Sequence, residues 1–280
     1  MNSCIVLQTH IDKYDPAGNL TLNQRKYIVE LSIKQLRWYN PSSYIIVTGH
    51  GVVEPSDEVK SMVNHFMWED IAPQMNNVGQ VVGMPAQFYY VSKGIKYAKE
   101  RGFTHILKTR GDTLVGIPDI LDYCESIITK ENTKMLLTQQ TGWEHFKMGD
   151  CFIFGETDLM DSIWDMNNKV EHWDGLVNTG IHFLEYFTKD ITIENYIKYL
   201  KENCSFRDLI KLKFSCIRWN YHTLDEIGWD SLIEQIKNKT FDFNEYHWGK
   251  IPEYHKFDNA GNMIFSHLPF YYSEKTYYNL

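Results

Sequence analysis

The stretch THILKTRGD, residues 104–112, decides the predicted fold of this chain. It follows the clearest helical pattern of the sequence, Pro85–Arg101, which Gly102 is well placed to end. A strand in this position is expected to be central in a parallel sheet, and such strands are normally apolar because both of their faces are buried. This one instead carries charged side chains at alternating positions: Lys108, Arg110 and Asp112.

The alternation places the three charges on one face of the strand. Because unpaired buried charges are costly, we expect them at the carboxyl end of the strand, where the chain leaves the core. Ligands of open α/β sheets bind at that end, and Gly111 lets a ligand approach the backbone closely. The alternative is a purely structural ion pair between Arg110 and Asp112 that fixes a turn.

The segments before this strand alternate between strand and helix patterns. Apolar runs at Cys4–Gln8 and Tyr44–Thr48 predict two strands. A capping-box pattern at Thr21–Gln24 predicts the start of one helix, and Ser56–Asp70 is predicted as another. This alternation favours an α/β fold with a mostly parallel sheet flanked by helices.

The segments after this strand continue the pattern and then become mainly helical. They contain two predicted strands and three predicted helices: Met135–Thr138, Cys151–Phe154, Tyr123–Ile128, Asp158–Met166 and Ile193–Leu200. Asp174-Gly175 and Asn178–Gly180 are typical of turns. We predict one domain over residues 1–280, with a ligand-binding core at 1–160 and a helical, loop-rich part at 161–280.

Composition restricts the partners and the compartment. The net charge of −8 repels polyphosphate, so we expect no nucleic-acid partner, and a phosphate ligand needs local neutralisation by a metal ion or placed cations. No run approaches a membrane span, and the first residues lack a signal-peptide pattern. The five cysteines show no CxxC spacing, which favours a reducing compartment. We predict a cytoplasmic protein, a location that includes the cytosolic face of a membrane or, for a viral protein, the host cytoplasm.

Two segments resemble a known family. The glycine-ended helix followed by HILKTRGD is similar to the donor-site strand of GT-A-type glycosyltransferases, in particular the WavE-like lipopolysaccharide-synthesis group of bacteria and viruses. MGDCFIFG, residues 148–155, resembles a later element of that group. The resemblance covers roughly residues 4–160. It implies a GT-A-like fold and transfer of a sugar from a UDP-sugar or GDP-sugar donor to a glycan or glycolipid acceptor.

The resemblance also implies a donor site. Asp112 would bind a divalent metal, Mn²⁺ or Mg²⁺, and through it the diphosphate. His267 is a candidate for an additional metal or phosphate ligand, with a packed or surface histidine as the alternative. Many GT-A enzymes carry Asp-x-Asp here, whereas this chain has Arg110 in the first position. One carboxylate can suffice when phosphate and water supply the other oxygens, and an arginine can itself pair with phosphate. Two further groups would belong to the donor site. The residues near the nucleoside would be Gln8, Thr9 and His10, and those near the phosphates would be Lys108, Arg110 and Gly111.

A catalytic carboxylate is also expected. Inverting glycosyl transfer needs a base for the acceptor hydroxyl, and Asp150, at the entrance of a predicted strand, is our candidate, with Glu144 and Asp174 as rivals and a turn or cap role as the alternative. Residues 139–147 are a candidate loop that closes over the substrate. Several tryptophans are candidates for stacking on sugar rings: Trp143, Trp173, Trp219, Trp229 and Trp248.

Two other functions use the same fold. A sugar-phosphate nucleotidyltransferase normally has a glycine-rich basic loop after the first strand, and residues 12–19 contain one Gly and one Lys. A non-catalytic glycan-binding protein on a transferase-like fold is the second alternative. The sequence has no P-loop, no Gly-x-Gly-x-x-Gly after the first strand and no Gly-x-Ser-x-Gly elbow, which removes other common uses of an α/β sheet.

Overall fold

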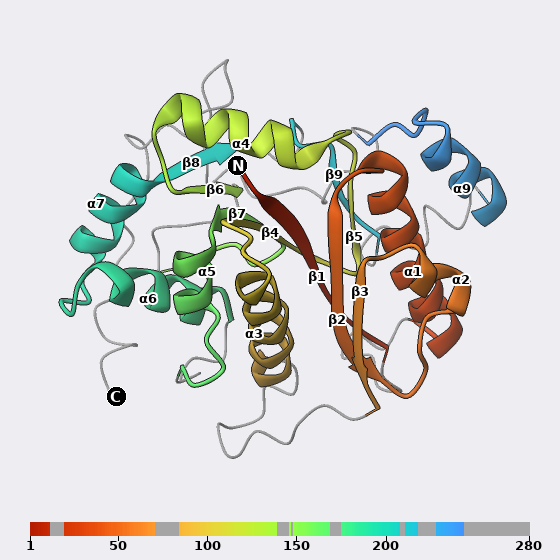
Figure 1. Ribbon diagram of the computed structural model, residues 1–280, viewed down its shortest axis with the longest axis horizontal. Helices are drawn as coiled ribbons and strands as arrows, with labels where there is room; N and C mark the ends of the chain where they lie inside the picture. The colour runs from red at the N-terminus through yellow and green to blue at the C-terminus, as the bar shows by residue number, and fades with distance from the viewer. Residues whose placement is uncertain are drawn as a thin grey trace.

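The computed structural model describes residues 1–11, 20–70, 84–138, 146, 148–168, 175–207, 211–217 and 228–243 of the chain (Figure 1). Its strands are β1 (Ser3–Ile11), β2 (Tyr44–Gly51), β3 (His65–Glu69), β4 (His105–Arg110), β5 (Thr113–Val115), β6 (Met135–Thr138), β7 (Phe152–Glu156), β8 (Cys204–Arg207) and β9 (Phe214–Cys216). Its helices are α1 (Leu22–Tyr39), α2 (Asp57–Ser61), α3 (Met84–Glu100), α4 (Ile120–Glu131), α5 (Thr157–Ile163), α6 (Gly175–Phe187), α7 (Ile193–Asn203) and α9 (Trp229–Lys237).

Seven of these strands form one sheet in the order β3-β2-β1-β4-β7-β6-β8. Only β7 among them runs antiparallel to its neighbours, β4 and β6, whereas the β1–β2, β1–β4, β2–β3 and β6–β8 pairs are parallel. The prediction of a mostly parallel α/β sheet is therefore confirmed, and the THILKTRGD stretch forms the strand beside β1 near its centre.

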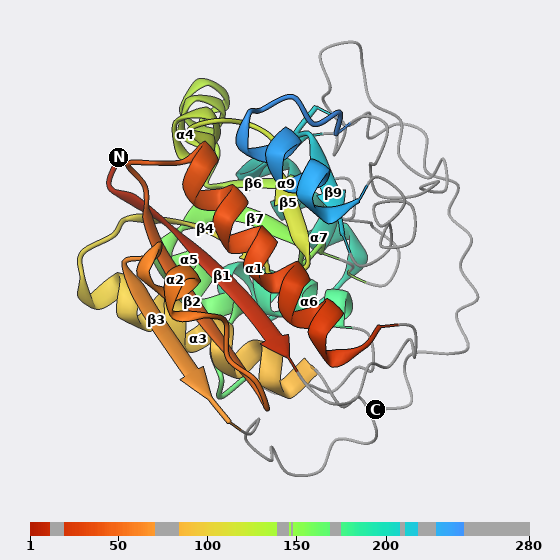
Figure 2. The same cartoon turned by 90° about the vertical axis from the view of Figure 1, so that its right-hand side faces the viewer.

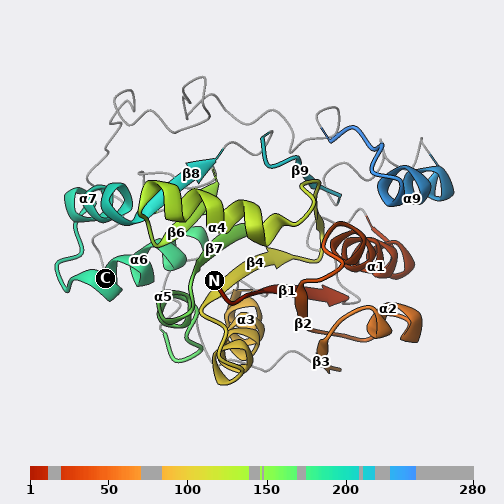
Figure 3. The same cartoon turned by 45° about the horizontal axis from the view of Figure 1, so that its top comes forward.

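The strands are buried on both faces because their side chains alternate between two apolar clusters. In β1, Cys4 and Val6 pack with α3, while Ile5 and Leu7 pack with α1 and α4. Figure 3 shows α1 and α4 on one side of the sheet and α3 and α5 on the other. This two-sided cover leaves the strand ends as the places where polar side chains can gather without being enclosed by the core.

A second, two-stranded sheet fixes the chain after β4. β5 follows Asp112 directly and pairs antiparallel with β9, and the Ile217 backbone N–H donates to the Asp112 carbonyl at 2.9 Å. α9 packs alongside α1 in the same region (Figure 2). The Trp229 and Tyr27 rings of these helices lie 4.6 Å apart. Segments from the carboxyl-terminal part of the chain thus support the residue at the end of β4.

The predicted helix at Ser56–Asp70 is wrong in its second half. Only Asp57–Ser61 is helical, and His65–Glu69 forms the edge strand β3. Asn64 causes the change, because its backbone N–H donates to the Ile45 carbonyl and its side chain accepts from the Ile45 N–H, both at 2.9 Å. These bonds start a ladder along β2, and the aromatic residues that follow suit a half-buried strand.

Helix α6 covers a segment that we predicted to contain turns. Asn178 and Thr179 are buried, and Gly180 lies so close to the Phe146 carbonyl that a Cβ atom there would overlap it. Tertiary packing of this segment therefore overrides the local turn signal of its Asn, Thr and Gly residues.

The capping box at the start of α1 is confirmed. The Gln24 N–H donates to the Thr21 hydroxyl at 3.3 Å, and the Gln24 side chain accepts from the Thr21 N–H at 2.7 Å. We expect Thr21→Ala to lower the free energy of unfolding by about 1 kcal/mol, because one helix N–H loses its acceptor. Urea unfolding measures this, and Thr21→Ser, which keeps the hydroxyl, should retain most of the stability; equal losses in both variants would contradict the capping role.

No helix in the described ranges is both long and apolar enough to cross a membrane.

Candidate functional site

The end of β4 lies beside the end of β1. Gln8 is the register partner of Arg110, and the Gly111 N–H donates to the Gln8 carbonyl at 2.9 Å. Beyond this point β1 continues alone with β2, where Thr9 pairs with Gly49. The strand geometry therefore places the predicted nucleoside-side and phosphate-side residues next to each other at one edge of the sheet.

Arg110 and Asp112 form a two-point ion pair across the Gly111 turn. Nε of Arg110 donates to Oδ1 of Asp112 at 3.0 Å, and Nη2 donates to Oδ2 at 2.7 Å. Thr113 completes the turn, because its hydroxyl donates to the Arg110 carbonyl at 2.8 Å. Both oxygens of the Asp112 carboxylate are thus engaged by one guanidinium.

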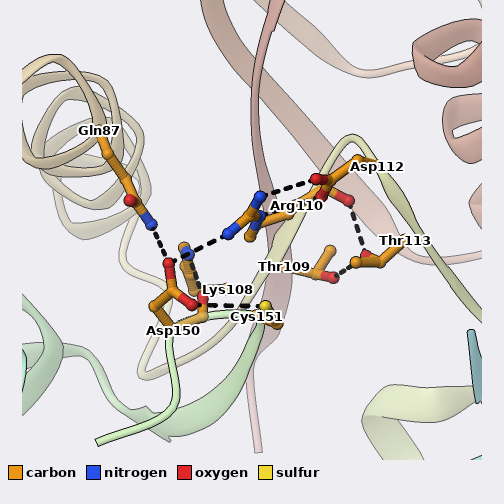
Figure 4. A network of polar contacts seen from close by, with 8 residues as sticks. All are labelled: Gln87, Lys108, Thr109, Arg110, Asp112, Thr113, Asp150 and Cys151. Carbon is orange, nitrogen blue, oxygen red and sulfur yellow. Dashed lines mark hydrogen bonds and ion pairs between the residues drawn. The ribbon is translucent and has the colours of Figure 1, made fainter. Parts of the chain in front are cut away.

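Asp150 reaches the same guanidinium from the turn before β7 (Figure 4). Its Oδ2 lies 3.4 Å from Nη1 of Arg110 and accepts from Nε2 of Gln87 at 2.7 Å. Its Oδ1 accepts from the Cys151 thiol at 3.3 Å. Asp150 is buried, so segments 40 residues apart in the chain converge on one Arg–carboxylate network.

Lys108 lies deeper than we predicted. It is fully buried in the middle of β4, paired in register with Ile153 of β7, and does not sit where the strand leaves the core. Its Nζ donates to the backbone carbonyl of Asp150 and lies 4.8 Å from the centre of the Trp164 ring. Hydrogen bonding and the ring face together make the buried ammonium tolerable.

The network shifts the pKa values of its members. Burial lowers the pKa of Lys108 to about 8, although the Asp150 carboxylate opposes part of that shift. Burial alone would raise the pKa of Asp150, but Arg110, Lys108 and the hydrogen bond from Gln87 together hold it well below its usual range. At neutral pH the cluster therefore contains two cations and two carboxylates.

The Lys108 shift makes stability depend on pH. An unfolded lysine keeps its proton up to about pH 10.4, whereas folded Lys108 releases it near pH 8. The unfolded state therefore binds more protons between these values, and the free energy of unfolding should rise with pH there, by about 2–3 kcal/mol from this group. Denaturant unfolding from pH 7 to 10 checks this against Lys108→Met, which lacks the titrating group; parallel curves for the two proteins would contradict it.

A row of stacked rings joins the ends of β1 and β2 to α3. The His10 and His50 rings stack at 5.7 Å, and His50 stacks on Tyr90 of α3 at 4.8 Å. The Tyr90 hydroxyl donates to Glu69 at the end of β3 at 3.0 Å. His10 is partly buried, whereas His50 and Tyr90 are buried.

The structure joins most of the predicted site and adds a residue that the sequence analysis missed. Gln87, on α3, is buried and holds Asp150. It lies four residues before Val91, so a polar residue on the buried face of the helix was its signal. Trp229 packs against Tyr27 of α1. The other predicted residues lie outside the described residues: His267, Glu144, Asp174, Trp143, Trp173, Trp219 and Trp248.

The described residues do not form a metal site. Both oxygens of Asp112 accept hydrogen bonds from Arg110, and within the described ranges no three His, Cys, Asp or Glu side chains converge as metal ligands would. A hard divalent cation needs several oxygen ligands. Among the described residues, the charged groups at this edge of the sheet are a guanidinium and an ammonium balanced by two carboxylates.

No protein-family model and no curated protein matches the sequence. Among solved structures, a cytidylyltransferase from Leptospira borgpetersenii serovar Hardjo-bovis has a TM-score of 0.48 at 13% identity and covers 88% of this chain and 92% of its own. A glycosyltransferase involved in glycosylation of the major capsid of PBCV-1 has a TM-score of 0.42 at 12% identity and covers 80% and 91%. Core-mannan synthase A from Aspergillus fumigatus, in its Mn/GDP form, has a TM-score of 0.40 at 8% identity and covers 65% and 69%. Similarity at this level assigns no activity to this chain.

Proposed function

We propose that the protein is a glycosyltransferase that moves a sugar from a nucleoside-diphosphate sugar to a glycan or glycolipid acceptor. One observation carries the proposal: a guanidinium held by two carboxylates at the carboxyl end of β4, beside the end of β1. Ligands of open α/β sheets bind at this edge, and the resemblance of residues 104–112 and 148–155 to GT-A donor-site elements supports the same reading.

The proposal places the donor along this edge. The nucleoside lies beside Gln8, Thr9 and His10, at the end of β1. The diphosphate lies toward Arg110, because a guanidinium fork matches phosphate oxygens. The sugar then points away from β1, toward the turn that carries Asp150.

The acceptor base is a separate question. Asp150 has hydrogen-bond partners on both oxygens, and its pKa is held well below its usual range. A carboxylate of this kind takes up a proton poorly at neutral pH. We therefore propose that Asp150 positions Arg110 and that another residue accepts the proton of the acceptor hydroxyl.

A ligand screen tests the proposed function. Thermal unfolding is followed with UDP, GDP and CDP, with their common sugar conjugates, and with nucleoside triphosphates plus sugar phosphates, each with Mn²⁺ and with EDTA. One nucleoside-diphosphate series should raise the melting temperature, and its sugar conjugate should be hydrolysed slowly without acceptor. Stabilisation only by a triphosphate, with pyrophosphate release from a sugar phosphate, would instead identify a nucleotidyltransferase. If no nucleotide stabilises the protein, both the glycosyltransferase and the nucleotidyltransferase hypotheses are overturned.

Asp112→Ala tests the placement of the donor. The variant removes the carboxylate that fixes two nitrogens of the Arg110 fork. We expect donor turnover to fall by about 100-fold, because a charge-assisted two-point contact is worth about 2–3 kcal/mol. Asp122→Ala, on α4 and outside the network, is the control and should leave turnover unchanged. Unchanged turnover in Asp112→Ala would place the donor elsewhere.

A further inference from the structure

Arg110 lies between two carboxylates that come from different parts of the chain. Asp112 follows β4 and holds Nε and Nη2 at 3.0 and 2.7 Å, while Asp150 precedes β7 and lies 3.4 Å from Nη1. Figure 4 shows the guanidinium extended between the two carboxylates. A position between two carboxylates at a ligand edge is one that a divalent cation commonly takes, and here a side chain takes it.

The guanidinium keeps donors for a ligand. An arginine has five N–H groups, and within the described part of the chain three of them contact Asp112 and Asp150. The other two belong to Nη1 and Nη2, one on each nitrogen. The Arg110 side chain is 23% exposed, so a phosphate from solvent can reach it and accept two parallel hydrogen bonds.

The cluster can accept an anionic ligand only because the two cations are present. Asp112 and Asp150 alone would repel a diphosphate, and would attract a metal ion instead. Arg110 and the buried Lys108 bring the cluster to neutrality. The built-in cations therefore remove the repulsion that the two carboxylates would exert on a diphosphate, in a chain whose net charge is −8.

The surroundings hold this arrangement in place. Gln87 and Lys108 fix the side chain and the carbonyl of Asp150, and the Ile217 N–H fixes the carbonyl of Asp112. A guanidinium whose partners are fixed from three elements loses little freedom when it binds a ligand, which favours affinity.

We propose that Arg110 is the resident cation of the donor site: its guanidinium takes the place between Asp112 and Asp150 that a divalent metal would take, and its two remaining N–H groups bind the donor diphosphate directly. The inference rests on the proposed function and goes beyond it, because it makes donor binding independent of Mn²⁺ and Mg²⁺. It also gives Asp150 and Gln87 the role of positioning residues.

Calorimetric titration of the full chain with nucleoside diphosphates tests this. The ligands are UDP, GDP and CDP, each with excess EDTA and with excess Mn²⁺. The diphosphate that binds should have the same Kd in both conditions, within about threefold. Binding that needs Mn²⁺ overturns the inference and leaves the proposed function standing. Absence of binding in both conditions overturns the proposed function, and the inference with it.

Variants of Arg110 provide a second test, and one of its two readouts, Mn²⁺ binding, does not use the nucleotide. In EDTA, Arg110→Ala should raise the Kd for the diphosphate by about 100-fold, and Arg110→Lys, which keeps the charge but loses the fork, by about 10-fold. Arg110→Ala also frees two carboxylates, so it should bind Mn²⁺ alone, seen as loss of the free-ion electron paramagnetic resonance signal. Neither the wild type nor the double variant Arg110→Ala with Asp112→Asn should bind Mn²⁺ in this assay.

The positioning role of Gln87 is tested separately. Gln87→Leu removes the hydrogen bond to Asp150 without removing a charge, so we expect a Kd about 3–10-fold higher in EDTA with an unchanged circular dichroism spectrum. Gln87→Glu places a third carboxylate beside Asp150 and should weaken binding further.

If Arg110→Ala folds, binds the diphosphate as wild type does in EDTA and binds no Mn²⁺, Arg110 is not the resident cation.

Discussion

Asp150→Asn is expected to lower the free energy of unfolding by about 3–5 kcal/mol at pH 7. The substitution keeps the size of the side chain but removes the negative charge that faces Arg110 and Lys108. Lys108 is fully buried, so its ammonium would lose its nearest compensating charge in the core. Removal of one charge from a buried network destabilises a protein by more than the intact network stabilises it, because the remaining charge stays buried without a partner or water.

An exposed ion pair of the same length is the matched control. Asp165 lies 3.4 Å from Lys96, the separation that joins Asp150 to Arg110, but its side chain is 37% exposed whereas that of Asp150 is 10% exposed. Asp165→Asn should therefore cost less than about 1 kcal/mol. Urea unfolding of both variants measures the difference, and equal losses would show that burial of the Asp150 network does not determine its contribution.

The effect of Asp150→Asn should also depend on pH. The pKa of Asp150 is lower in the folded protein than in the unfolded chain, so the unfolded state takes up a proton first as the pH falls. The stability that the carboxylate contributes is fully present above the unfolded pKa of about 4 and is lost below it. The gap between wild type and variant should narrow from pH 5 toward pH 3, and a constant gap would contradict this origin.

The sequence predicted the framework of the fold because its strongest signals are local. The strands β1, β2 and β4, the helix α3 and the capping box at Thr21 each follow from neighbouring residues, and their alternation implies a parallel sheet. β3 and α6 were not predicted, because Asn64 pairs with a residue of another strand and the buried Asn178–Gly180 segment is shaped by its packing. Local propensity contains no information on such contacts.

The candidate site was predicted in part for the same reason. The charges of residues 108–112 and the edge where they lie follow from strand alternation. The depth of Lys108 and the approach of Asp150 to Arg110 do not, because both depend on the antiparallel placement of β7 beside β4. Gln87 could have been suspected as a polar residue on an apolar helix face, but its partner could not.

Gly111→Ala should have the second large effect, lowering the free energy of unfolding by about 3 kcal/mol. A Cβ atom at position 111 would overlap both Cβ and Oγ1 of Thr9. Rotation of the Thr9 side chain moves the hydroxyl but not the Cβ atom, so the backbone of β1 or of the turn must shift. β1 is central in the sheet and paired on both sides, which makes such a shift costly.

A second substitution distinguishes overlap from other effects of alanine. Thr9→Gly removes both atoms that the new Cβ would meet, so the double variant should be more stable than Gly111→Ala alone, with a coupling energy of about 1–3 kcal/mol in a double-mutant cycle. Gly102→Ala is the comparison, since no atom lies near its Cβ position and only its positive φ of 77° opposes the change; its cost should be about 1 kcal/mol and independent of Thr9. Additive losses of stability for Thr9→Gly and Gly111→Ala would contradict the close approach of β1 to the turn.

The same substitution links the fold to the proposed chemistry. Gly111 separates Arg110 from Asp112, and its N–H ties the turn to Gln8 at the end of β1. A backbone shift that relieves the overlap at Thr9 must move Arg110, Asp112 or both away from that strand. We therefore expect Gly111→Ala to raise the Kd for the nucleoside diphosphate by at least about 10-fold, and Thr9→Gly to recover part of this loss together with the stability. Recovery of stability without any recovery of binding would place the nucleotide elsewhere than between β1 and the Arg110 turn.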